Sequence, residues 1–389
     1  MGQRLELLAT SLKLGLTSFG GPVAHLGYFF DEYVKRKKWL DETAWADLVA
    51  LCQFLPGPAS SQLGMAIGIQ RAGWWGGVIA WVGFTLPSAL ALWAFALLMQ
   101  GFGTETKWFH GLLVAAVAVV AQAVWSMGKK FANRTSTGLI ALGCAALLTV
   151  LNNPYAQILV IIIGGVIGWR FFREETQPHE APPLRRRTAL TALALFGALL
   201  AGLPLLAAAV PNRWLELASG FYRAGALVFG GGHVVLPLLQ QAVVPQGWVT
   251  NAQFLTGYGA AQAVPGPLFT FAAYLGAVCL PGQGGVGGAL VGLLTIFLPS
   301  YLLVVAALPF WNRLRTGPRF RGALTGINAV VVGILLAALY NPVASSALLT
   351  PGDFALALVA FGLLQLARWP SWAVVAVTAG GGAVLALGT

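Results

Sequence analysis

Apolar stretches long enough to cross a lipid bilayer recur along the whole chain, from about residue 5 to residue 388. A helix needs about 20 mostly apolar residues to span a hydrocarbon core of about 30 Å. Only 9% of the 389 residues are charged, whereas soluble domains carry about 25%, so the chain cannot cover a water-facing surface. The sequence predicts an all-α polytopic membrane protein and excludes a soluble enzyme, a disordered scaffold and a secreted disulfide framework.

The net charge of +11 comes from basic residues that collect in a few short loops. This is typical of the cytoplasmic side of a membrane protein, so it does not indicate a nucleic-acid partner. Cys52, Cys144 and Cys279 lie in or near apolar runs without a CxxC spacing, which predicts neither a metal site nor a disulfide. The chain lacks HExxH, GxSxG and P-loop motifs. We therefore expect no enzymatic activity, no cofactor and no pumping driven by ATP.

Two halves of the chain carry the same motifs in the same order. The matching motifs are Phe19-Gly20-Gly21 with Phe229-Gly230-Gly231, Pro56-Gly57-Pro58 with Pro265-Gly266-Pro267, and Leu86-Pro87-Ser88 with Leu298-Pro299-Ser300. Single residues align in the same way: Glu6 with Glu216, Lys13 with Arg223, and Gln53 with Gln262. An ordered series of matches of this kind predicts an internal duplication.

A polar stretch near the middle separates the halves. We predict a first repeat over residues 1–172, a cytoplasmic linker over 173–188, a linking transmembrane helix over 189–214 and a second repeat over 215–389.

Basic residues lie in opposite loops of the two halves. The loop at 31–42 carries four consecutive cations and its partner at 240–251 carries none, whereas 101–110 is nearly neutral and its partner at 311–321 carries four arginines. The positive-inside rule then predicts repeats of inverted topology. The loops at 31–43 and 101–109 need opposite sides of the membrane, yet two apolar segments lie between them. The segment 44–69 therefore either turns back to the same side at Pro-Gly-Pro or crosses fully, and both interpretations stay open.

The first candidate site combines charged residues with a glycine break. Glu6 and Lys13 lie two helical turns apart, and Gly20, Gly21 and Pro22 follow. Consecutive glycines and a proline open the backbone, and free amides and helix N-termini attract anions. The mirror residues are Glu216, Arg223, Gly230 and Gly231. The alternative is that Lys13 snorkels to the membrane surface.

The second candidate site is the Pro-Gly-Pro turn with neutral hydrogen-bond donors on either side. Its residues are Gln53, Pro56, Gly57 and Ser60 in the first half, and Gln262, Pro265, Gly266 and Thr270 in the second. Donors without a full charge suit a desolvated oxyanion, and broken helices at matching positions of two repeats indicate a transporter binding site. The alternative is a structural kink between packed helices.

Four residues are candidates for proton coupling: Glu6, Glu216, His25 and His233. A histidine titrates near neutral pH, although the favoured interpretation of His25 and His233 is a hydrogen-bonded interfacial histidine. The carboxylates could carry protons or neutralise Lys13 and Arg223 when the site is empty. These residues predict a secondary transporter with rocking of one set of elements against another.

The motifs "FGGP" at 19–22 with His25, "CQFLPGP" at 52–58, "FGGGHVVLPLL" at 229–239 and "AVPGP" at 263–267 resemble the chromate ion transporter family in its long, two-half form. This resemblance implies export of chromate across the cytoplasmic membrane, linked to the proton motive force, with sulfate as the natural competitor. Sulfate or oxyanion uptake and a passive anion channel remain alternatives, and a homodimer is possible. The second half has Gly232 where the first has Pro22, so the two sites need not be equivalent.

Overall fold

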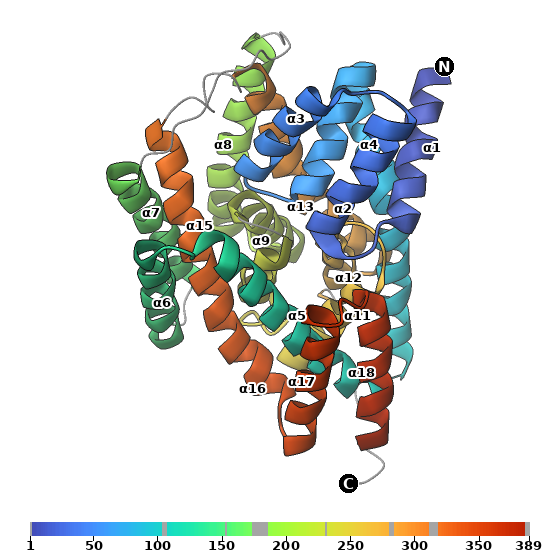
Figure 1. Ribbon diagram of the computed structural model, residues 1–389, viewed down its shortest axis with the longest axis vertical. Helices are drawn as coiled ribbons and strands as arrows, with labels where there is room; N and C mark the ends of the chain where they lie inside the picture. The colour runs from blue at the N-terminus through green and yellow to red at the C-terminus, as the bar shows by residue number, and fades with distance from the viewer. Residues whose placement is uncertain are drawn as a thin grey trace. The chain divides into compact units, whose positions relative to one another are not determined.

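The computed structural model describes residues 2–102, 107–151, 154–172, 186–229, 232–279, 284–310 and 318–385. Within these ranges the chain is built from helices and contains no strand (Figure 1). The first half contains α1 (Gly2–Thr17), α2 (Gly21–Phe29), η1 (Phe30–Arg36), α3 (Glu42–Phe54), α4 (Ala59–Phe102), α5 (Lys107–Phe131), α6 (Thr135–Val150) and α7 (Pro154–Phe171). The helix α8 (Arg186–Ala209) follows the linker. This all-α membrane architecture confirms the predicted fold class.

The second half begins with α9 (Arg213–Leu227), η2 (Gly232–Val234), α10 (Val235–Val243), α11 (Asn251–Ala263), η3 (Leu268–Thr270), α12 (Phe271–Val278), α13 (Gly285–Ala307) and η4 (Leu308–Phe310). It continues with α15 (Pro318–Ala338), η5 (Leu339–Ala344), α16 (Ser345–Ala347), α17 (Pro351–Gln365) and α18 (Ser371–Leu385). Five described helices are long and apolar enough to cross a membrane.

The chain folds into two compact units, and each unit draws on both halves of the sequence. Unit 1 consists of Met1–Leu97, His179–Val235 and Val264–Asn312, and unit 2 of Leu98–Pro178, Leu236–Ala263 and Arg313–Thr389. The boundaries of the compact units therefore differ from those of the sequence repeats. All the glycine breaks and both Pro-Gly-Pro turns fall in unit 1.

In unit 1, glycines at similar positions of the two halves let the two helices of a hairpin come into backbone contact. The helix α4 turns at Ala72 (φ −137°, ψ 23°) and Gly73 (φ 66°, ψ −160°), which makes it two helices that meet at a corner. A side chain on Gly76 would collide with the carbonyl oxygen of Gly68, and one on Gly288 with that of Gly276. The α12–α13 pair thus repeats the packing of the two arms of α4.

Helices on both sides of each Pro-Gly-Pro turn are short. The helix α3 has 13 residues and spans about 20 Å, less than a hydrocarbon core of about 30 Å. The first arm of α4 runs only from Ala59 to the turn at Ala72. The predicted apolar segment 44–69 is therefore two short helices joined at the turn, neither long enough to cross alone.

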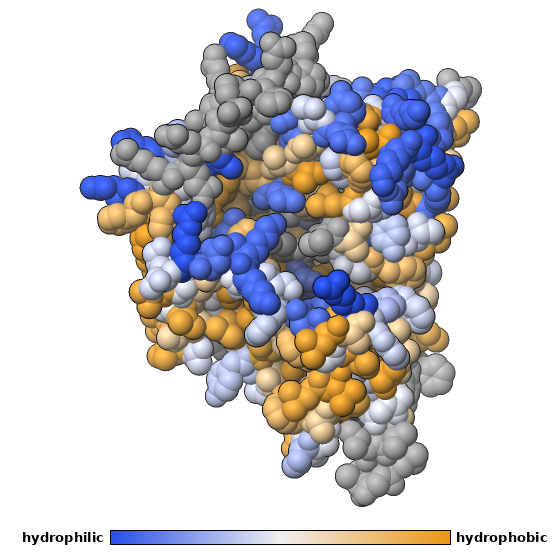
Figure 2. All heavy atoms as spheres, viewed as in Figure 1, coloured by the Kyte–Doolittle hydropathy of each residue, from blue (hydrophilic) through white to orange (hydrophobic). Residues whose placement is uncertain are grey.

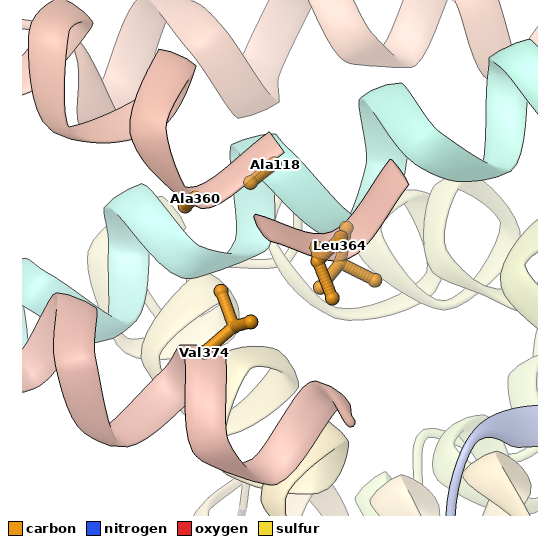
Figure 3. Close-up of a cluster of buried hydrophobic side chains, with 5 residues drawn as sticks. Ala118, Ala360, Leu364 and Val374 are labelled. Atoms are coloured by element: carbon orange, nitrogen blue, oxygen red, sulfur yellow. The ribbon is translucent and has the colours of Figure 1, made fainter. Parts of the chain in front are cut away.

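In unit 2, helices from the first half of the sequence pack against helices from the second half. First-half α5 packs against second-half α11, α17 and α18, and second-half α15 packs against first-half α6 and α7. In Figure 1 α6, α7 and α15 lie side by side. Figure 3 shows Ala118 of α5 beside Ala360 and Leu364 of α17 and Val374 of α18, in a cluster that also includes Val119. Neither half could form these contacts without the other.

Glycines let α7 and α15 approach to backbone contact, which yields the first prediction. A side chain on Gly326 would overlap the carbonyl oxygen of Gly164, so Gly326→Leu should lower the free energy of unfolding by about 1–3 kcal/mol or more. Gly143 of α6 has open space at its Cβ position, so Gly143→Leu is the matched control. Thermal denaturation of the purified variants in detergent measures the difference, and equal midpoints would contradict this packing.

Candidate functional site

A break between α1 and α2 is made by two glycines in the left-handed backbone region. Gly20 has φ +93° and Gly21 has φ +76°. Side-chain-bearing residues rarely adopt these angles, so glycine is required there. Pro22 in the first turn of α2 needs no hydrogen-bond partner for its nitrogen. The sequence thus ends α1 and starts α2 within a few residues, leaving the N-terminus of α2 at the break.

Each Pro-Gly-Pro turn is hydrogen-bonded to the glycine break of the other half. The Gly57 N–H donates to the Val228 carbonyl at 2.7 Å, and the Gly266 N–H donates to the Ser18 carbonyl at 2.8 Å. Ser18 and Val228 occupy equivalent positions in the two repeats, directly before Phe-Gly-Gly. The two bonds are therefore related by the duplication, and within unit 1 each joins the Pro-Gly-Pro turn of one half to the residue before Phe-Gly-Gly of the other half.

Serines of the Leu-Pro-Ser repeats fill the space beside these turns. Gly57 has φ +123° and Gly266 has φ +94°. A Cβ atom at Gly57 would collide with Ser300 Oγ, and one at Gly266 would lie 2.8 Å from Ser88 Oγ. The two serines are equivalent in the repeats. Each Pro-Gly-Pro turn thus packs against the serine hydroxyl group of the other half: Gly57 against Ser300, and Gly266 against Ser88.

Polar side chains connect the N-termini of α2 and α4. His25 Nδ1 lies 3.1 Å from Ser60 Oγ, and the edge of its ring meets the Phe84 ring with centroids 5.5 Å apart. Gln62 Nε2 donates to the Pro56 carbonyl at 2.7 Å. Two helix N-termini, each with unsatisfied first-turn amides, therefore lie near one hydrogen-bonded pair.

Several buried polar atoms in this part of unit 1 have no hydrogen-bond partner among the described residues. They are Ser18 Oγ, His25 Nε2, Ser61 Oγ, Gln62 Oε1, Thr85 Oγ1 and Ser300 Oγ. Buried polar atoms are normally satisfied, so a group of unsatisfied ones indicates a place for water or a guest. Hydroxyls and helix amides are neutral donors, which suit an oxyanion.

The charged candidates have partners other than those predicted. Lys13 Nζ lies 2.6 Å from Glu32 Oε2, and its side chain is 47% exposed. Glu6 pairs with Lys37 at 2.7 Å. The hypothesis that Glu6 neutralises Lys13 is therefore wrong, because Glu32 of η1 and Lys37, the residue after η1, are placed beside α1. Arg223 is half-buried and has no ion pair within the described ranges.

Comparison with known proteins identifies the same family that the motifs at these breaks resemble. The family model for chromate transporters matches residues 5–169 and 215–385. The chain belongs to the chromate transporter family. The two matched ranges leave out the polar linker and α8, and they fit a membrane protein made of two repeats.

Named relatives match most of the chain. It is 32% identical over 342 residues to a chromate transport protein of Pseudomonas aeruginosa, covering 85% of this chain and 79% of that protein. It is 28% identical over 347 residues to one of Cupriavidus metallidurans (86% and 81%). A probable chromate transport protein of Synechococcus elongatus is 27% identical over 341 residues (86% and 83%). No solved structure matches the chain.

The remaining predicted site residues of this family member are spread over both units. Thr270 is buried, and its Oγ1 donates to the Pro267 carbonyl at 2.7 Å, which closes the turn rather than leaving a free donor. Gln53 is exposed, and Gln262 belongs to unit 2 with a buried Nε2 that no described residue accepts from. The half-buried candidates are Pro56, Pro265, Glu216 and His233. Gly230 and Gly231 lie outside the described residues.

Sequence reasoning did not single out Glu32, Ser88 and Ser300, which the structure places beside the candidate residues Lys13, Gly266 and Gly57. Ser88 and Ser300 carried a signal, since each is a polar residue repeated within an apolar segment. Glu32 carried almost none. It lies in a run of acids and bases that is typical of a solvated loop, yet its side chain is buried.

Proposed function

We propose that this protein is a secondary active transporter that exports chromate across the cytoplasmic membrane at the expense of the proton motive force. Membership of the chromate transporter family and the names of the relatives support the substrate. The observation that carries the proposal is the pair of crossed hydrogen bonds from Gly57 and Gly266 in unit 1. A protein that only needed stable helices would have no reason to join two helix-breaking turns to distant segments beside buried, unsatisfied hydroxyl groups.

The proposed binding mode uses neutral donors at the breaks and cations nearby. First-turn amides of α2 and α4, with the hydroxyls of Ser60, Ser61 and Ser300, would replace water around the oxyanion. Lys13 lies near the end of α1, six residues before Phe19. It would attract the dianion, and Arg223 would do so in the second half. Rocking of one set of elements against the other would then open the site to each side in turn.

Chromate flux into everted membrane vesicles tests this function. Energised vesicles that contain the protein should accumulate chromate several-fold over vesicles without it, and a protonophore should abolish the difference. Excess sulfate should reduce the flux, because sulfate has the same shape and charge. Flux without counterflow exchange would indicate a passive channel, and accumulation only in right-side-out vesicles would indicate uptake. Either outcome would contradict the proposal.

A further inference from the structure

Glu32 carries a buried carboxylate, and two cations bind the same one of its oxygens. The residue is only 5% exposed. Oε2 accepts from Lys13 Nζ at 2.6 Å and from Arg36 Nη1 at 3.1 Å. Oε1 is buried too, and no described residue donates to it. Glu32 lies in η1, a π-helical segment, a geometry that is rare and often found at functional sites.

This arrangement leaves the two carboxylate oxygens in different environments: Lys13 and Arg36 both bind Oε2, whereas Oε1 has no described partner. A buried ionised oxygen without a donor is unfavourable, and a proton at Oε1 would remove its charge and turn it into an O–H donor. The side chains of Lys13 and Arg36 are 47% and 59% exposed, so the cations lie between Glu32 and the solvent. Figure 2 shows hydrophilic residues gathered over this end of unit 1, near α1 and α2.

The second repeat shows that the fold does not require this carboxylate. The motif matches at Gly21 with Gly231 and at Trp39 with Trp248 place Glu32 opposite Gln241 or Ala242, both neutral. The second half still forms a helix there, α10. The cation equivalent to Lys13 is Arg223, which has no ion pair among the described residues. The carboxylate is therefore a feature of the first half alone.

We propose that Glu32 is the proton-binding residue of the transport cycle. When ionised, it holds Lys13. When a proton from the solvent binds at Oε1, Lys13 is released to the chromate dianion, and the proton returns to the solvent after the anion leaves. Protonation raises the combined charge of Lys13, Arg36 and Glu32 from one positive charge to two, which matches the dianion. This inference rests on the proposed function and names the residue that couples it to protons.

The direction of coupling agrees with export. One proton that accompanies each dianion leaves one net negative charge moving outward, and the inside-negative membrane potential drives that movement. The potential, rather than the pH difference, would then be the effective part of the proton motive force.

Other charged or titratable groups lie on the elements around Glu32. Lys37, directly after η1, pairs with Glu6 of α1, and Arg71 of α4 stacks on Trp39. Tyr33 is the next residue of η1, and the adjoining helices carry His25 on α2 and Glu42 and Asp47 on α3. Within the described ranges only Lys13 and Arg36 pair with Glu32, so these two cations are the charges that a change at Glu32 would affect directly.

Proton uptake on chromate binding tests this assignment. The purified protein in weakly buffered detergent solution is mixed with chromate at pH 8 to 9, where chromate is already the dianion, and a pH indicator reports protons taken up. The unmodified protein should take up about one proton per chromate bound. The Kd for chromate should therefore rise by up to tenfold for each unit of increase in pH. Glu32→Gln should bind chromate with no proton uptake and a flat pH profile.

The matched control is Asp31→Asn, because Asp31 is the adjacent residue and forms an exposed pair with Lys35. Asp31→Asn should take up protons as the unmodified protein does. Chromate binding by the unmodified protein without proton uptake would overturn the role of Glu32 and leave the proposed function standing, even if Glu32→Gln failed to fold. Proton uptake by Glu32→Gln on chromate binding would also overturn the role of Glu32. Absence of chromate binding and of flux in the unmodified protein would overturn both proposals.

Discussion

Chromate flux should fall to background in a Gly57→Ala variant, although only one methyl group is added. The backbone at Gly57 has φ +123°, a conformation that costs a side-chain-bearing residue about 1–3 kcal/mol. The new Cβ atom would also collide with Ser300 Oγ and lie 2.8 Å from Gln62 Nε2. The turn would have to move, and the Gly57 N–H bond to Val228 would be lost with it.

The equivalent turn should respond in the same way. Gly266 has φ +94°, and its Cβ position lies 2.8 Å from Ser88 Oγ and 3.3 Å from the Phe84 carbonyl oxygen. Gly27→Ala in α2 is the control, since nothing lies within 4 Å of its Cβ position. Flux is measured at equal protein content in everted vesicles. Flux above half of the unmodified level in both turn variants would contradict a site built from the crossed turns.

The breaks could be predicted from the sequence, but their pairing could not. Phe-Gly-Gly and Pro-Gly-Pro are local signals, because glycine conformation and the missing proline N–H act on the residue itself. Which carbonyl accepts from the Gly57 N–H depends on how distant segments pack. The duplication predicted two similar halves, whereas the structure joins the turn of one half to the break of the other.

The ion pairs of Glu6 and Lys13 likewise could not be predicted from the sequence. Spacing along one helix placed Glu6 and Lys13 together, since residues seven apart share a face. Each instead pairs with a residue in or directly after η1: Lys13 with Glu32 of η1, and Glu6 with Lys37, which follows η1. Periodicity describes one helix at a time and contains no information about which neighbour lies beside it. The basic loop at 31–42 entered the sequence analysis only as a signal of topology, whereas in the structure its residues Glu32 and Lys37 also supply partners for α1.

Arg223→Gln should lose chromate flux by about tenfold or more and keep normal amounts of protein in the membrane. The half-buried Arg223 has no ion pair among the described residues, so its removal leaves no buried carboxylate unpaired. Charge-assisted contacts with an oxyanion are worth about 1.5–3 kcal/mol, or roughly one to two powers of ten in affinity. Arg223→Lys should keep most of the flux, because it keeps the charge.

Arg213→Gln is the matched control, because Arg213 is exposed at the start of the same helix, α9. Equal flux in Arg213→Gln and Arg223→Gln would contradict a role for Arg223 in binding. Lys13 needs a different design, since Lys13→Gln removes one of the two cations that hold Glu32. The double variant Lys13→Gln with Glu32→Gln removes the pair together. If Lys13 binds chromate, the double variant should be folded and still inactive, whereas recovery of flux in it would mean that Lys13 serves only to neutralise Glu32.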